Sequence, residues 1–113
     1  MNIIGKQGEA AALAFLRKSG YHIIATNYKT CFGEVDIIAK EKNVTIFVEV
    51  KSRSGSAFGH PFEAVTPKKQ EKIRKVALFY MKQKKVEIPV RFDVLSINIA
   101  GGEEKIEHIR DAF

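Results

Sequence analysis

The spacing of hydrophobic positions changes along the chain, beginning with a helical repeat over residues 6–19. Apolar side chains recur there at helical spacing: Ala10, Leu13, Ala14 and Leu16. Arg17 and Lys18 would occupy the last turn, and Gly20 follows them. Basic residues before a glycine are typical of a helix C-terminus. The pattern therefore predicts a first helix over residues 6–19.

Three segments dense in β-branched and aromatic residues come next. They are YHIIATNYK at 21–29, GEVDIIA at 33–39 and VTIFVEVKS at 44–52. Glu41, Lys42 and Asn43 predict a short hairpin turn between the second and third strands. The following segment, SRSGSAFGHPFEAV, is rich in Ser and Gly without a sustained period, which predicts a loop.

A second helix is expected from Thr66 and Pro67 to about Lys85. Thr can cap free N–H groups, and Pro at the first helical position loses no needed donor. The helical period predicts a buried face made of Ile73, Val76, Ala77 and Tyr80. Beyond Pro89, VRFDVLSINIA and KIEHIR predict two closing strands. The expected order is αβββαββ, an α/β or α+β fold.

Composition narrows the class of protein. A chain of 113 residues suits one compact domain spanning residues 1–113. No apolar run approaches the roughly 20 residues that cross a bilayer, and the N-terminus runs directly into the first helix, so we expect no membrane segment and no leader. The single cysteine, Cys31, cannot form an internal disulfide, and it has no nearby partners for a zinc site. A cytoplasmic protein is the default expectation.

Positive charge is concentrated in the middle of the chain. The net charge is +6, but residues 51–91 hold eleven Lys and Arg against three Glu, a local balance of +8. Such a localised excess suits a polyanion, which favours a nucleic acid, although an anionic membrane or an acidic protein would also fit. Basic helix faces are also common as ordinary solvated surface.

Two carboxylates share one region of the predicted sheet. Side chains alternate along a strand, so Asp36 lies on one face of its strand and Glu49 and Lys51 share a face of the next. Pairing of these strands would bring Asp36 and Glu49 close enough to hold one ion. Oxygen ligands favour Mg²⁺ or Mn²⁺, and Lys51 could orient water or stabilise charge on a phosphate. The alternative is that Asp36 serves as a turn residue or as an ion-pair partner of Lys51.

Glu9 is a further candidate ligand. At 100° per residue, Glu9, Leu13 and Leu16 fall within about 60° of one another, which places Glu9 on the apolar stripe of the first helix. A carboxylate there needs a partner, because charged residues are rarely buried unpaired. It would either reach the metal or pair with a lysine across the fold.

These motifs resemble those of a known nuclease superfamily. GEVDIIA followed by FVEVKSR resembles the Asp…Glu-x-Lys core of the PD-(D/E)xK nucleases, with Val35 where the nominal proline stands, and Glu9 is similar to the helix glutamate of archaeal Holliday-junction resolvases. With GEAAALAFLRKSGY, FGHPFEAVTPKKQEKI and HIRDAF, nearly the whole chain resembles the small bacterial YraN family.

The resemblance implies a fold, site residues and partners. The expected fold is restriction-endonuclease-like, a central mixed β-sheet flanked by helices. Asp36, Glu49 and Lys51 would be the motif residues, with Gln70 as a polar residue near the active site. Because the related resolvases act as symmetric pairs, a homodimer is an expectation by analogy.

Residues around the acidic pair are candidates for nucleic-acid binding. Arg53 and His60 lie in or beside the predicted loop, where the alternative for His60 is ordinary polar packing. Lysines at a helix N-terminus oppose the macrodipole unless an anion binds there. The second helix carries four candidates of this kind: Lys68, Lys69, Lys72 and Lys75.

Three function classes follow from the sequence. The first is a Mg²⁺- or Mn²⁺-dependent endonuclease acting on structured or branched DNA, although RNA is not excluded. The second is a catalytically weak or inactive nucleic-acid-binding module of a repair, recombination or uptake assembly. The third is an interaction protein whose basic helix binds an acidic partner.

Overall fold

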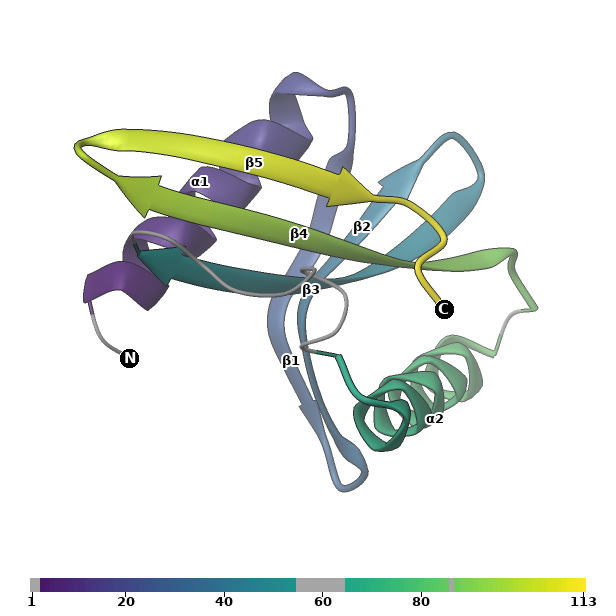
Figure 1. Ribbon diagram of the computed structural model, residues 1–113. Helices are drawn as coiled ribbons and strands as arrows, with labels where there is room; N and C mark the ends of the chain where they lie inside the picture. Colours follow the sequence, from purple (N-terminus) through teal and green to yellow (C-terminus); the bar gives the residue numbers. More distant parts are fainter. Residues whose placement is uncertain (1–2, 55–64, 86) are drawn as a thin grey trace.

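The predicted order of helices and strands is confirmed. The computed structural model describes residues 3–54, 65–85 and 87–113. Along the chain they form α1 (Ile3–Lys18), β1 (His22–Thr30), β2 (Gly33–Glu41), β3 (Val44–Ser54), α2 (Pro67–Lys84), β4 (Val90–Ala100) and β5 (Glu103–Ile109) (Figure 1). The architecture is a single compact domain of the α+β class.

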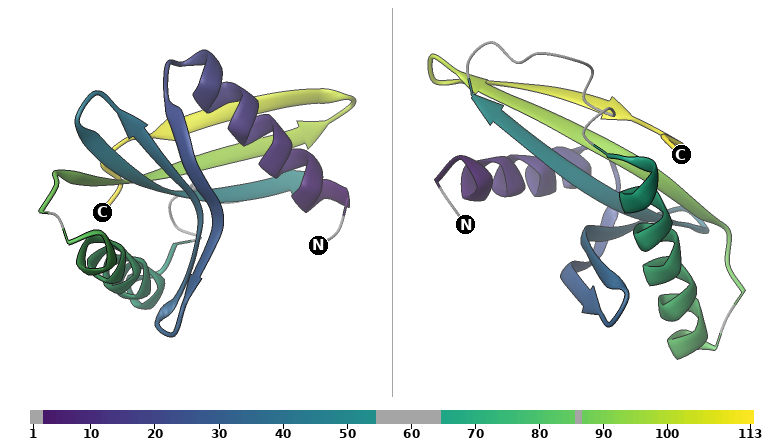
Figure 2. Two further views of the ribbon diagram at one scale, coloured as in Figure 1. Left: turned by 180° about the vertical axis from the view of Figure 1, so that it is seen from behind. Right: turned by 60° about the horizontal axis from the view of Figure 1, so that its bottom comes forward.

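The strands form one mixed sheet in the order β1-β2-β3-β4-β5. Neighbouring strands are antiparallel except β3 and β4, which are parallel. Parallel strands need a crossover connection, and α2 lies within the connection between β3 and β4. The two helices lie on opposite faces of the sheet (Figures 1 and 2).

Each helix covers its own hydrophobic cluster. Ala12 and Leu16 of α1 pack on a cluster that includes Ile46 and Val48 of β3. The residue between them, Phe47, belongs to the cluster under α2. Because side chains alternate along a strand, β3 supplies both cores from consecutive residues. The face predicted for α2 is confirmed, since Ile73, Val76, Ala77 and Tyr80 are its buried residues.

The face predicted for α1 is partly wrong. The helix starts at Ile3, and two positions expected in its core, Ala10 and Ala14, are exposed. Leu16 is buried as predicted, and Gly8 and Ala12 are buried in place of the two alanines. A Cβ at Gly8 would collide with the side chain of a serine in β3. This close approach of the helix to the sheet rotates α1 away from the orientation that its apolar residues alone favour.

A buried ion cluster that the sequence did not reveal joins β4 to β5. Asp93 is fully buried and accepts hydrogen bonds from Nε and Nη2 of Arg91, both at 2.8 Å, and from the backbone N–H of Asp111 at 3.0 Å. His108 Nε2 lies 2.7 Å from Asp93 Oδ2. Burial opposes the charge, but the contacts with His108 and Arg91 outweigh it and lower the pKa of Asp93 to about 2.

Neither α1 nor α2, as far as the structure describes them, is long and apolar enough to cross a bilayer.

Candidate active site where β2 separates from β3

The pairing between β2 and β3 ends in the middle of both strands. Backbone pairing runs from Glu41↔Val44 to Ile37↔Val48. Beyond that point the backbone N–H of Val50 donates to the Asp36 carboxylate over 2.7 Å. A side chain thus replaces the missing backbone acceptor, and β2 continues with β1 as a hairpin that projects away from β3 (Figure 1).

Asp36 and Glu49 lie together at this separation. Glu49 is 4% exposed and Asp36 is half-buried. Burial, then the charge of Glu49 and a hydrogen bond with it, raise the pKa of Asp36 to about 7, against smaller lowering effects of the Val50 N–H and Lys69. The pair therefore resists carrying two negative charges at neutral pH, and a cation would relieve that repulsion.

Two lysines border the acidic pair. Lys51 Nζ lies 4.0 Å from Glu49 Oε2, and Lys69 forms a short ion pair with the same oxygen. Burial and the neighbouring Lys69 ammonium lower the pKa of Lys51. Burial also disfavours the charge on Lys69, but its hydrogen bonds, with Glu49 foremost, prevail and raise its pKa. The sequence predicted that Lys69 contacts phosphate, and it did not reveal the ion pair with Glu49. That ion pair forms because α2 and β3, which are distant along the chain, approach each other in the fold.

The N-terminus of α2 is held at this site by local bonds. The Thr66 hydroxyl accepts a hydrogen bond from the Lys69 N–H over 3.2 Å, which confirms the predicted cap. Gln70 Nε2 donates to the Val65 carbonyl over 3.0 Å. Gln70 is half-buried and thus secures the start of the helix that carries Lys69. Its catalytic role stays a prediction.

A cleft of about 390 Å³ adjoins the acidic pair. It lies between the start of β2 and the first turns of α2, and its lining includes Gly33, Glu34, Thr66, Lys68, Lys69 and Lys72. Lys69 belongs both to this cleft and to the ion pair with Glu49. An anion entering the cleft therefore meets three lysines next to the carboxylates.

Gly33 is a component of the cleft that the sequence analysis did not single out. It has φ +145°, and a Cβ built on it would lie 3.6 Å from Lys72 Cβ. The start of β2 thus packs directly on α2. A glycine at the first position of a strand is the signal that could have indicated this close contact.

Glu9 has a different partner from those expected. Its Oε1 accepts a hydrogen bond from Asn27 Nδ2 of β1 over 2.9 Å. Within residues 3–54, 65–85 and 87–113, no three His, Cys, Asp or Glu side chains gather in a group able to hold a metal ion. The structure brings Asp36 and Glu49 together and pairs Glu9 with Asn27, so metal binding by Glu9 stays a prediction.

The remaining nucleic-acid candidates fall in three places. Lys68, Lys72 and Lys75 are exposed on α2, where Lys75 pairs with Glu71 over 3.5 Å. Arg53 lies half-buried near the end of β3. His60 lies outside the described residues.

Comparison with known proteins finds similarity over almost the whole chain. A family model described as uncharacterised protein family UPF0102 matches residues 8–97. A UPF0102 protein of Thermodesulfovibrio yellowstonii is 47% identical over 110 residues, which cover 97% of this chain and 95% of that protein. One from Syntrophus aciditrophicus is 44% identical, covering 96% and 87%, and one from Syntrophomonas wolfei is 42% identical, covering 97% and 96%.

Proposed function

The chain belongs to the uncharacterised protein family UPF0102, and we propose that it is a metal-dependent endonuclease that hydrolyses phosphodiester bonds of nucleic acid at Asp36 and Glu49. The family description states no activity, so the proposal depends on the site. The matches support the YraN-like resemblance, while placement in the PD-(D/E)xK superfamily is part of the proposal.

The observation that carries the proposal is the contact between Asp36 and Glu49. Two carboxylates in a largely buried setting, with the pKa of Asp36 raised to about 7, form a site that gains from a divalent cation. Hard ions such as Mg²⁺ take one or two carboxylates and complete their shell with water and phosphate oxygens, so the donor set fits Mg²⁺ or Mn²⁺. Such an ion, when bound, would make water more acidic and offset charge on the reacting phosphate.

The lysines have roles that do not depend on the ion. Lys51 lies beside Glu49 with a lowered pKa, so its ammonium releases a proton more readily than that of an exposed lysine. In its charged form it orients an attacking water or stabilises the charge on the phosphate. Lys68 and Lys72 line the adjoining cleft, where they bind neighbouring phosphates and align the strand.

Cleavage assays test this function directly. Linear, flapped and four-way-junction DNA, and RNA, are incubated with Mg²⁺, Mn²⁺ or EDTA. We expect metal-dependent cleavage, with branched DNA preferred, that falls by a factor of about 100 or more in Asp36→Asn and in Lys51→Ala. Glu71→Gln is the matched control, because Glu71 is 68% exposed on α2 and forms an ion pair with Lys75 rather than with the acidic site.

A second function is favoured by one contact. Lys69 forms a short ion pair with Glu49. This ion pair neutralises a carboxylate that a metal ion would need as a ligand. A nucleic-acid-binding module without catalysis would keep this pair permanently. Salt-sensitive binding of all substrates, with no cleavage in either metal, would reject the endonuclease in favour of the binding module.

The resemblance to resolvases also suggests a homodimer acting on a two-fold substrate. Sedimentation of the free protein and of its complex with a four-way junction tests this proposal. A single copy bound to each junction would contradict it.

A further inference from the structure

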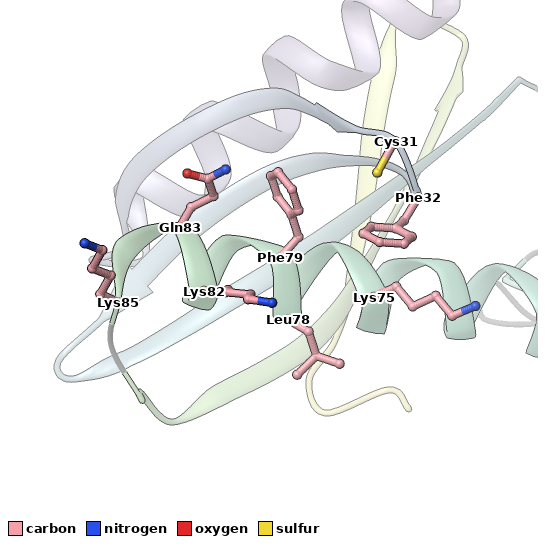
Figure 3. Close-up of a pocket in the computed structure, with 8 residues that line it drawn as sticks. All are labelled: Cys31, Phe32, Lys75, Leu78, Phe79, Lys82, Gln83 and Lys85. Atoms are coloured by element: carbon pink, nitrogen blue, oxygen red, sulfur yellow. The ribbon is translucent and has the colours of Figure 1, made fainter.

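A second hollow, of about 630 Å³, lies between the β1–β2 turn and α2 (Figure 3). Phe32, Leu78 and Phe79 form its apolar part, and none of them belongs to either core cluster. Phe32 is 47% exposed and Leu78 is 62% exposed. The rings of Phe32 and Phe79 meet edge to face with centroids 6.2 Å apart. Exposed apolar side chains gathered in this way mark a binding surface.

The rim of the hollow is basic. Lys75, Lys82 and Lys85 line it, and no acidic side chain stands among its described lining residues. At 100° per residue, Lys68, Lys72, Lys75 and Lys82 of α2 fall within about 80° of one another, with Phe79 inside the same stripe. The stripe runs about 21 Å along the helix at 1.5 Å per residue. Cations interleaved with a half-buried aromatic are therefore aligned along one face of α2.

This hollow continues into the cleft beside Asp36 and Glu49. Cys31 and Phe32 line the hollow, and the next two residues, Gly33 and Glu34, line the cleft. On α2, Lys75 lines the hollow and Lys72, one helical turn away, lines the cleft. Together the two form one path along α2, lined by lysines and by a single carboxylate, that of Glu34, among its described lining residues; we call it the strand groove.

We propose that the strand groove holds an unpaired segment of a nucleic-acid strand, with a base stacked on Phe32 and its phosphates neutralised by Lys75 and Lys82. Aromatic faces within a basic groove are the general means of binding single strands, because every base has a π-face. An acidic peptide would satisfy the lysines, but it would not use an aromatic pair aligned with a path to a phosphodiester site. The choice of a nucleic acid over an acidic peptide and the direction of the strand toward Asp36 rest on the proposed function, whereas the basic and aromatic lining of the groove does not.

Oligonucleotide binding in EDTA tests the proposal without cleavage. The probes are fluorescent DNA and RNA single strands of about 15 nucleotides, within the site size of known single-strand binders, and a DNA duplex of equal length. We expect Phe32→Ala to weaken single-strand binding by about 5- to 150-fold, which corresponds to the 1–3 kcal/mol of one stacked base. Duplex binding should change less than about twofold, because a paired base cannot stack on Phe32.

Matched controls separate stacking from general effects. Ile24→Ala removes another exposed apolar side chain, 37% exposed on β1 and outside the groove lining, and should leave every affinity unchanged. Lys82→Gln should weaken single-strand binding and reduce its salt dependence by about one ion, whereas Lys18→Gln on α1 should not.

Cys31 provides a readout that needs no variant. It is the single cysteine of the chain, is exposed, and lines the groove. A saturating single strand should slow alkylation of Cys31 by a neutral maleimide by at least about tenfold, the effect expected if a bound strand covers the thiol more than nine-tenths of the time. The duplex should leave the alkylation rate within about twofold of the free protein.

The outcomes distinguish this inference from the proposed function. Equal single-strand affinity of Phe32→Ala and wild type, or an unprotected Cys31, would overturn the groove even if the enzyme cleaves DNA. If single-strand affinity depends on Phe32 but no substrate is cleaved, the strand groove is supported and the endonuclease proposal is rejected. Loss of self-association in Phe32→Ala, with unchanged oligonucleotide binding, would assign the surface to a second copy of the chain and also overturn the inference.

Discussion

At the scale of single residues, the chain contains two acidic sites of opposite character. Asp93 is surrounded by donors, so its ionised form is stabilised and its pKa falls to about 2. Asp36 is buried beside another carboxylate, so its ionised form is destabilised and its pKa rises to about 7. The first arrangement stabilises the fold, whereas the second reduces its stability, a loss that a bound cation would offset.

Asp36→Asn should stabilise the metal-free protein at high pH. Because the folded-state pKa of Asp36 lies above the ordinary 3.8, the folded protein loses stability as pH rises from about 4 to about 7, and the loss persists above 7. Asparagine carries no charge and keeps an oxygen for the Val50 N–H. Thermal unfolding in EDTA at pH 8 should show a Tm higher by about 5 °C or more, since 1 kcal/mol shifts Tm by roughly 4–8 °C in small domains.

The same variant should differ little from wild type at pH 4, where folded Asp36 is protonated. Glu71→Gln, on the exposed face of α2, should leave Tm unchanged at both pH values. A Tm of Asp36→Asn equal to or below that of wild type at pH 8 would show that the two carboxylates do not repel each other in the fold.

Asp93→Asn should destabilise the protein by about 3–5 kcal/mol at pH 7, because it leaves Arg91 and His108 without their buried counter-charge. Urea unfolding measures this loss, and Glu107→Gln on the exposed surface of β5 is the control. The folded-state pKa of Asp93 is depressed, so its stabilisation is present above pH 3.8 and is lost as pH falls toward about 2. If the free energy of unfolding falls equally in Asp93→Asn and in wild type as the pH is lowered below 3.8, this assignment is contradicted.

At the scale of elements, the position of each helix was predictable to a different degree. The face of α2 followed from periodicity because its apolar residues and its buried residues coincide. The face of α1 did not, because alanines occur all around this helix and provide little contrast between faces. The contact that orients α1 is a backbone approach at Gly8, and a glycine contributes nothing to a hydrophobic pattern.

Gly8→Ala should destabilise the fold by about 1–3 kcal/mol, although alanine favours a helix by about 1 kcal/mol over glycine. The reason is the collision of the new Cβ with the Ser52 side chain. Urea unfolding of Gly8→Ala, Ser52→Ala and the double variant forms a cycle in which the two changes should be coupled, with part of the loss recovered. Additive effects, or a gain of stability in Gly8→Ala, would place α1 farther from β3 than the structure does.

At the scale of the whole molecule, the site is a product of three elements. The separated ends of β2 and β3 supply Asp36 and Glu49, and the start of α2 supplies Lys69. The β1–β2 hairpin and α2 both extend from that point (Figure 2). Residues of both line the strand groove. Catalysis and strand binding would therefore share α2 as their common frame.

Mg²⁺ or Mn²⁺ should raise the Tm of the wild-type protein, because a ligand bound only by the folded state stabilises it by about 2.7 kcal/mol at one hundred times its Kd. The rise should be greater at pH 8 than at pH 5, where protonation of Asp36 competes with the cation. Asp36→Asn and Glu49→Gln should abolish the shift, and Glu103→Gln, on an exposed position of β5, should retain it. An equal metal shift in Asp36→Asn would locate the cation elsewhere.

By itself the sequence determined the order of helices and strands, the cap at Thr66 and the strands that carry Asp36, Glu49 and Lys51, because these depend on local periodicity and backbone chemistry. Only the tertiary structure decided where β2 leaves β3, so that the Asp36 carboxylate binds the Val50 N–H. It likewise decided that Lys69 meets Glu49 and that Glu9 meets Asn27. These contacts join residues distant along the chain, and their geometry depends on how helices pack on the sheet, which no local pattern encodes.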